Sequence, residues 1–184
     1  MKFFKKYYED ISKCIQELDR NKINSICKLI KNTSKKRGTI YLAGNGGSAS
    51  TASHMSTDLT KNAKIKSMSF NDVNLITCFS NDYGYENWLK AAIKYYTKPN
   101  DLIVLLSVSG ESKNLINAAN FCKQKKIKLI TITGAKKNNL LSQKGNINYW
   151  INSKAYNIVE VVQMTILASI VDRIIGKSEY PSNL

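Results

Sequence analysis

From Gly38 onward, short apolar, β-branched runs alternate with stretches of helical periodicity, and this alternation constrains the fold more than any other feature. Five runs predict strands: Thr39–Ala43, Ile65–Phe70, Leu102–Ser107, Lys128–Thr133 and Ile147–Ile151. The intervening and following stretches predict helices: Ser48–Lys61, Tyr85–Tyr96, Lys113–Lys125 and Tyr156–Ile175. Strands and helices in this order form βαβ units. We therefore predict an α/β fold with an open parallel sheet and helices on both faces.

The first 37 residues have helical periodicity alone. Apolar side chains fall at i, i+3, i+4 and i+7, first at Ile11, Cys14, Ile15 and Leu18 and again at Ile23, Ile26, Cys27 and Ile30. This pattern predicts two amphipathic helices joined near Asn21. Because no linker or internal repeat interrupts the chain, we interpret residues 1–184 as one domain. It comprises a helical hairpin (1–37), an α/β core (38–176) and a tail (177–184).

Hydropathy predicts a chain that crosses no membrane. The longest apolar stretches, Leu102–Leu106 and Ile158–Val162, fall far short of the roughly 20 residues that a spanning helix needs. The basic N-terminus continues into Tyr7-Tyr8-Glu9-Asp10 and lacks the apolar segment of a signal peptide. The cysteines are scattered and form no C-x-x-C pair, so a disulfide framework is not expected. We expect a cytoplasmic protein.

The formal net charge of +15 raises the question of nucleic acid as a partner. The lysines, however, are spread over several segments, and no basic stripe interleaves with aromatic residues in the sequence. We therefore do not expect nucleic-acid binding. A field of this sign still favours a small anionic substrate.

The loop after the first predicted strand has the composition of an anion-binding site. It reads Gly44-Asn45-Gly46-Gly47-Ser48 and leads into a helix. Glycines allow the backbone to approach a ligand closely, and the free N–H groups of a helix N-terminus favour an anion. The spacing also satisfies a loose dinucleotide-binding fingerprint, with Asp72 as the ribose-binding acid.

A second loop, after the third predicted strand, distinguishes these readings. Ser107, Ser109 and Ser112 surround Gly110 at the start of a helix, and their hydroxyl groups suit a phosphomonoester. A dinucleotide fold needs no such loop, so phosphate binding is favoured. Helix capping is the alternative for any one of these serines. Ligands of parallel sheets bind at the carboxyl ends of the strands, where both loops lie.

Together, these motifs resemble the sugar isomerase (SIS) family, and within it the phosphoheptose (sedoheptulose 7-phosphate) isomerases. The matching segments are the Gly44–Ala49 loop, a helix with His54, the segment Asn81–Glu86, and Ser107-x-Ser-Gly-x-Ser. The resemblance implies a three-layer α/β/α sandwich with a five-stranded parallel sheet. It also implies a homo-oligomer, usually a tetramer, with active sites at subunit interfaces.

The resemblance assigns site residues position by position. Asn45, Gly46, Gly47 and Ser48 are expected at the sugar phosphate, together with Asn81 and Asp82. The phosphate is expected at Ser107, Val108, Ser109 and Ser112. Val108 departs from the threonine common at its position, so only a backbone contact is expected there.

Aldose–ketose isomerisation needs a base that moves a proton between neighbouring carbons and a group that stabilises the oxyanion. His54 and Asp58 stand at i, i+4 on one helix face. Glu160 lies on an otherwise apolar helix, where a carboxylate is costly to bury without a partner. We predict Asp58 or Glu160 as the base and His54 as an acid, a polarising group or a metal ligand.

Two departures from the family pattern concern this catalytic set. Asp58 replaces a glutamate and is shorter by about 1.5 Å. Depending on the register of the last helix, Ala168 or Leu167 occupies the position of a histidine that the family uses in catalysis and metal binding. The resemblance therefore implies at most a weak zinc site, with His54, Asp58 and Glu160 as ligands.

Two functions remain open. The first is isomerisation of sedoheptulose 7-phosphate or a related ketose phosphate for the heptose of surface polysaccharides. The second is a catalytically weak or inactive SIS module that binds a phosphosugar or a protein partner. The missing histidine favours the second.

Overall fold

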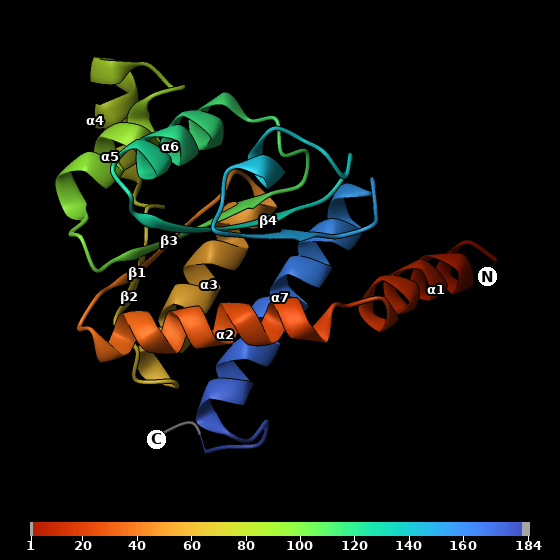
Figure 1. Cartoon of the computed structure of the whole chain (residues 1–184). Helices are drawn as coiled ribbons and strands as arrows, with labels where there is room; N and C mark the ends of the chain where they lie inside the picture. The colour runs from red at the N-terminus through yellow and green to blue at the C-terminus, as the bar shows by residue number, and fades with distance from the viewer. Residues whose placement is uncertain (1, 182–184) are drawn as a thin grey trace.

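A five-stranded sheet forms the centre of the protein in a computed structural model that describes residues 2–181 (Figure 1). All neighbouring strands pair in parallel, in the order β2-β1-β3-β4-β5. The strands are β1 (Ile40–Ala43), β2 (Ser67–Ser69), β3 (Leu102–Ser107), β4 (Lys128–Thr133) and β5 (Ile147–Trp150). The predicted α/β/α architecture is confirmed.

Burial on both faces explains why the central strands are almost uniformly apolar. Every residue of β1 and β3 is buried, and helices cover both sides. A strand covered on both faces reads as a continuous apolar run, since neither set of alternating side chains meets water. The sequence signal of these two strands therefore arises from their position in the middle of the sheet.

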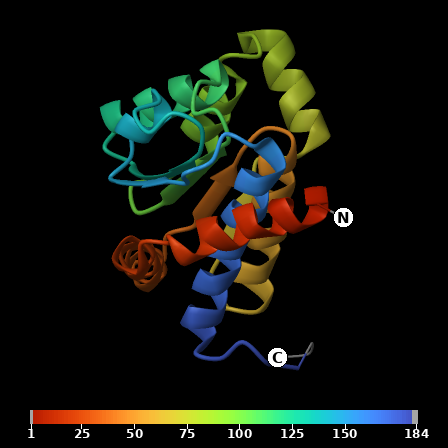
Figure 2. The same cartoon turned by 90° about the vertical axis from the view of Figure 1, so that its right-hand side faces the viewer.

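The helices divide into two layers, one on each face of the sheet (Figures 1 and 2). One layer packs through a core that includes Ile26, Met55 and Val162, and contains α2 (Arg20–Lys35), α3 (Gly47–Lys61) and α7 (Tyr156–Ile175). The opposite layer contains α4 (Val73–Tyr83), α5 (Trp88–Tyr96) and α6 (Lys113–Gln124). A short 3₁₀ helix, η1 (Leu141–Gln143), precedes β5.

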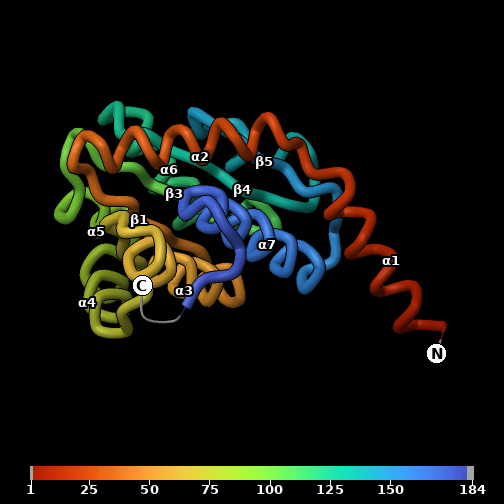
Figure 3. The backbone as a smooth tube through the Cα atoms, turned by 90° about the horizontal axis from the view of Figure 1, so that it is seen from below, coloured from red at the N-terminus to blue at the C-terminus, as the bar shows by residue number. Residues whose placement is uncertain are grey.

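The first helix, α1 (Lys2–Gln16), extends beyond the body of the protein (Figures 1 and 3). Phe3 is 71% exposed, and Phe4 and Tyr8 are each 61% exposed. The predicted helical hairpin is present, but its joint precedes Asn21. Asp19 is the last residue of the connection between α1 and α2. Its carboxylate caps α2 by accepting a hydrogen bond from the Lys22 N–H at 3.0 Å.

The segment between β2 and α5 differs from the prediction. The sequence analysis missed α4, which has no fully buried residue and therefore shows only a weak apolar stripe. Asp72, considered as a ribose-binding acid, instead caps α4 by accepting the Leu75 N–H at 2.9 Å. The next helix begins at Trp88, not Tyr85, and β2 is shorter than predicted.

The structure describes only part of the predicted tail. Of the predicted tail 177–184, residues 182–184 lie outside the described part. Among residues 2–181, no helix combines the length and the hydropathy of a membrane span.

Asp101 provides a test of how the sheet is anchored. Its buried carboxylate accepts the N–H of Thr39 and the N–H of Lys98, both at 2.7 Å. We expect Asp101→Asn to lower the free energy of unfolding by about 1.5–3 kcal/mol, because the amide leaves one buried N–H without an acceptor. Urea denaturation measures this. Asp10→Asn, which removes an exposed ion pair with Lys6, is the control and should change little. Equal effects would contradict the anchoring role.

Candidate functional site

A cavity of about 430 Å³ opens at the carboxyl ends of β1 and β3. The strand order reverses between these two strands, and loops diverge there to leave room for a ligand. The residues that line it are Asn45, Gly46, Gly47, Ser48, Ser107, Val108, Ser109, Ser112, Tyr156, Asn157 and Glu160. Both predicted phosphate loops therefore meet in one cavity.

Glycines shape the first loop for specific steric reasons. Gly46 has a φ of +55° and forms the N-cap of α3, a conformation that other residues rarely adopt. At Gly44, a Cβ would lie 2.7 Å from the backbone carbon of Ser48, which is too close. At Gly47, a Cβ would collide with the carboxylate of Glu160. The loop thus brings its backbone N–H groups to the cavity and admits a carboxylate against it.

Three helices begin at this cavity, and none of them has a side-chain cap. The N-cap residues are Gly46 for α3, Ser112 for α6 and Ala155 for α7, and no side chain bonds to the first-turn N–H groups. By contrast, Asp19 and Asp72 cap α2 and α4, which begin elsewhere. Uncapped N–H groups from three converging helices create a strongly anion-attracting site.

The serines of the second loop have distinct roles. Ser107 Oγ accepts the Gly110 N–H at 3.0 Å, and Ser109 Oγ accepts the Glu111 N–H at 3.2 Å. Both hydroxyl hydrogens can still be donated to a ligand. Ser112 makes no capping hydrogen bond. Simple capping therefore does not account for Ser112, and its half-buried hydroxyl lies at the cavity.

Glu160 supplies the one carboxylate among the described residues that line the cavity. It projects from the first part of α7 onto Gly47. Gln163, three residues later, is fully buried; Ser48 Oγ donates to its Oε1 at 2.8 Å, and its Nε2 donates to the Ile132 carbonyl at 3.2 Å. Gln163 thus ties α7 to α3 and β4 and holds Glu160 at the cavity.

Tyr156 and Asn157 also line the cavity, although the sequence analysis did not identify them. They stand in the first turn of α7 and are exposed. The predicted start of a helix after β5 could have indicated them. Side chains in the first turn of that helix lie at the same edge of the sheet as the two predicted phosphate loops. Neither residue belongs to a recognisable motif.

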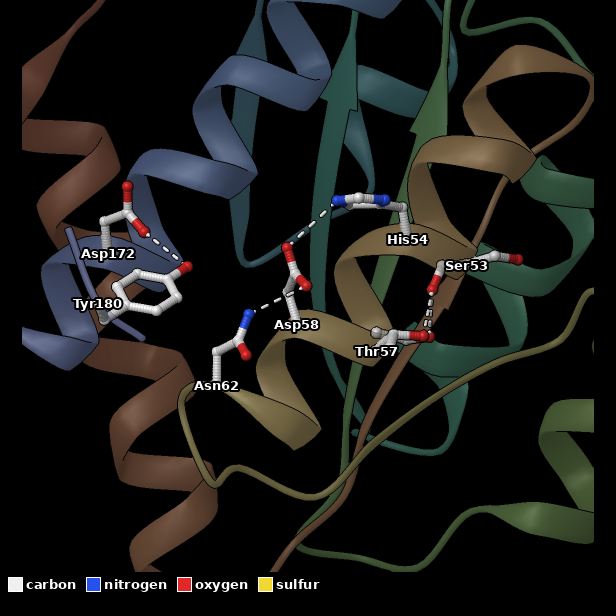
Figure 4. Close-up of polar contacts among 8 residues, drawn as sticks. Ser53, His54, Thr57, Asp58, Asn62, Asp172 and Tyr180 are labelled. Atoms are coloured by element: carbon white, nitrogen blue, oxygen red, sulfur yellow. Dashed lines mark hydrogen bonds and ion pairs between the residues drawn. The ribbon is translucent and has the colours of Figure 1, made fainter. Parts of the chain in front are cut away.

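His54 and Asp58 lie together on α3 but outside the cavity lining (Figure 4). His54 Nε2 is 3.2 Å from Asp58 Oδ2, and Asn62 Nδ2 donates to Asp58 Oδ1 at 3.1 Å. Both carboxylate oxygens therefore have partners. Nearby, the Tyr180 hydroxyl donates to Asp172 Oδ1 at 3.3 Å. Burial raises the pKa of Tyr180, and the negative charge of Asp172 raises it further, so the phenol remains protonated at neutral pH.

His54, Asp58 and Glu160 do not fit a zinc ion within one chain. Among residues 2–181, no group of three histidine, cysteine, aspartate or glutamate side chains is arranged to hold a metal ion. Glu160 therefore does not join His54 and Asp58, and the three-ligand site expected from the resemblance is not assembled here. A catalytic zinc ordinarily takes three protein ligands.

Asn81 and Asp82 occupy the end of α4, outside the cavity lining. Both are exposed, and Asn81 Nδ2 donates to Asp82 Oδ1 at 3.0 Å. Their predicted contact with the sugar stays a prediction.

The chain matches the SIS domain model over residues 3–134. It is 36% identical over 117 residues to the phosphoheptose isomerase of Haemophilus ducreyi, covering 61% of this chain and 60% of that protein. It is 32% identical over 139 residues to the Helicobacter pylori phosphoheptose isomerase, covering 72% of each. The match to the first relative thus spans less than two thirds of its length.

Solved structures with the same fold cover nearly the whole chain. Phosphoheptose isomerase GmhA from Neisseria gonorrhoeae has a TM-score of 0.85, with 19% identity and 95% coverage of both chains. A phosphoheptose isomerase from Francisella tularensis has a TM-score of 0.85, with 20% identity and 96% coverage of both. From the sequence matches and this shared fold, the chain belongs to the SIS domain family, in its phosphoheptose isomerase branch.

Proposed function

We propose that this protein is a sugar-phosphate isomerase that interconverts the ketose and aldose forms of sedoheptulose 7-phosphate or a related phosphosugar. The product would enter heptose synthesis for surface polysaccharides. The observation that carries the proposal is the cavity itself, where three uncapped helix N-termini and one carboxylate face the same space. A phosphosugar substrate agrees with the cytoplasmic location expected from the sequence.

In this proposal, the phosphate binds at the β3 loop. Ser107, Ser109 and Ser112 donate hydroxyl hydrogens, and the first-turn N–H groups of α6 add fixed positive charge. Val108 lines the cavity but offers only its backbone as a polar partner. The sugar then extends toward Asn45, Gly46, Gly47 and Ser48, with Asn81 and Asp82 as further contacts.

Glu160 is the base that the geometry favours. It lies at the cavity, whereas both oxygens of Asp58 are paired with His54 and Asn62. Glu160 would remove a proton from C1 of the ketose to give an enediolate. A proton would then pass from O1 to O2, and Glu160 would return its proton to C2 to give the aldose. Backbone N–H groups of the Gly44–Ser48 loop would stabilise the oxyanion. Asp58 would orient His54 as an acid where an assembled oligomer brings this pair to a cavity.

We propose further that the active form is a homo-oligomer, a tetramer as in the resemblance. The exposed Phe3, Phe4 and Tyr8 give α1 an apolar surface beyond the body of one chain. Val161 on α7 is 43% exposed. Such apolar surfaces are typical of subunit interfaces. In that assembly, residues of a neighbouring subunit would complete the site.

The second candidate is a catalytically weak or inactive phosphosugar-binding module. It is favoured by Ala168, a partly buried residue that leaves the expected histidine position of α7 without a polar group. It predicts sugar-phosphate binding without turnover.

The phosphate assignment predicts that Ser109→Ala and Ser112→Ala each weaken binding of sedoheptulose 7-phosphate by about 1–3 kcal/mol. Each removes a hydrogen bond to a charged group. Isothermal titration calorimetry measures the loss. Ser25→Ala, on the exposed surface of α2, is the control and should bind normally. Unchanged affinity in the Ser109/Ser112 double variant would sink the phosphate assignment.

The isomerase proposal predicts turnover of sedoheptulose 7-phosphate, followed as aldose formation by NMR. Glu160→Gln should reduce kcat by about 10²–10⁴-fold, the usual contribution of a general base, while phosphate binding is retained. Asp172→Asn, on the same helix, is the control and should retain turnover. Binding without turnover in the unmodified protein would favour the inactive module, and full activity of Glu160→Gln would exclude Glu160 as the base.

The oligomer proposal predicts a light-scattering mass near four times the 20.7 kDa chain mass at micromolar concentration. The double variant Phe4→Ser with Tyr8→Ser should dissociate it, because both rings lose their apolar surface. Tyr95→Ser, at a similarly exposed tyrosine on α5, should leave the assembly intact. A monomeric wild type contradicts the proposal.

A further inference from the structure

Asn45 and Asn114 form a reciprocal amide pair that links the two phosphate loops. Asn45 Nδ2 donates to Asn114 Oδ1 at 3.1 Å, and Asn114 Nδ2 donates to Asn45 Oδ1 at 2.9 Å. Asn45 belongs to the β1 loop, whereas Asn114 stands in the first turn of α6, 69 residues later. The pair therefore joins the carboxyl ends of β1 and β3 through side chains.

Asn114 is only 1% exposed, so its amide group depends on this partner. If the Asn45 amide rotated by 180°, oxygen would face oxygen and nitrogen would face nitrogen. Buried polar groups without partners are strongly disfavoured. The pair therefore fixes the Asn45 amide relative to the Asn114 amide, and the two can exchange oxygen and nitrogen only together.

Tyr85 strengthens the same orientation. Its hydroxyl donates to Asn45 Oδ1 at 3.4 Å, so this oxygen accepts hydrogen bonds from two donors. Tyr85 lies directly after α4, next to the segment that carries Asn81 and Asp82. Asn45 Oδ1 thus accepts one hydrogen bond from the first turn of α6 and one from the segment after α4.

These bonds leave one N–H hydrogen of Asn45. The amide carries two hydrogens on Nδ2, and the pair with Asn114 uses one. Asn45 is among the residues that line the cavity, so this hydrogen is available to a ligand there. Since both other polar positions of the amide are occupied, this hydrogen is a pre-oriented donor.

We propose that Asn114 and Tyr85 are positioning residues that hold the Asn45 amide as a donor to a sugar oxygen. The proposal rests on the proposed function, because it takes a phosphosugar as the ligand. Asn114 stands two residues after the phosphate-loop Ser112, so it couples phosphate binding to recognition of the sugar. The pair therefore selects phosphosugars over phosphate alone.

The experiment compares inorganic phosphate with sedoheptulose 7-phosphate by calorimetry. Asn114→Ala should bind inorganic phosphate within about twofold of wild type but bind the sugar phosphate roughly tenfold more weakly, the effect of one lost hydrogen bond. Tyr85→Phe should give a smaller loss in the same direction. Asn117→Ala is the control, since Asn117 lies on the same helix and bonds to the Glu86 carbonyl and Asn87 instead.

Asn114→Leu, an uncharged side chain of similar shape, replaces Asn114→Ala if the smaller residue unfolds the protein. If the Asn114 variants keep the wild-type ratio between the affinities for sedoheptulose 7-phosphate and for inorganic phosphate, the positioning role is wrong. Turnover is measured separately on the same samples: a wild type that binds the sugar phosphate without isomerising it refutes the isomerase, while the affinity ratio still decides the role of Asn114. In an active protein, Asn114→Ala should raise KM more than it lowers kcat.

Discussion

The convergence of three uncapped helix N-termini on one cavity is the feature on which the rest of the site depends. Each helix start has free N–H groups and a partial positive charge. Their common location follows from the parallel sheet, because every helix that leaves the carboxyl end of a strand begins at the same edge. Away from the cavity, aspartates cap α2 and α4, whereas α5 has no side-chain cap. At the cavity, none of the three N-cap residues bonds through its side chain to these donors.

This anion site also explains where the chemistry can occur. In the function that we propose, a phosphate held at the β3 loop would leave its sugar to extend along the β1 loop, toward the Glu160 carboxylate that lies against Gly47. The close approach of carboxylate and loop needs glycine at position 47. By comparison, His54 and Asp58 pair with one another on α3 and lie outside the cavity lining. Binding groups and one candidate base therefore share a cavity, while the second polar pair needs an assembled oligomer or another role.

Several elements could be predicted from sequence because their signals are local. The apolar runs of β1 and β3 and the helical periodicity of α2 indicated their structure directly. α4 was missed because it lies on the surface with no fully buried residue, so its sequence carries little pattern. The glycine and serine loops were identifiable since each motif depends on backbone conformations within a few residues. Tyr156 and Asn157 carry no motif, and only the packing of α7 brings them to the cavity.

The sequence by itself determined the α/β architecture and the two glycine- and serine-rich loops, since these depend on short-range periodicity and on glycine and serine at fixed spacing, and its motifs carried the resemblance to the family. Only the tertiary structure decided which carboxylate faces the cavity. Asp58 and Glu160 were equal candidates in sequence, but packing of α7 places Glu160 against Gly47 and leaves Asp58 bonded to His54 and Asn62. It also revealed the link between Asn45 and Asn114, because a hydrogen bond across 69 residues forms only when the sheet brings the ends of β1 and β3 side by side.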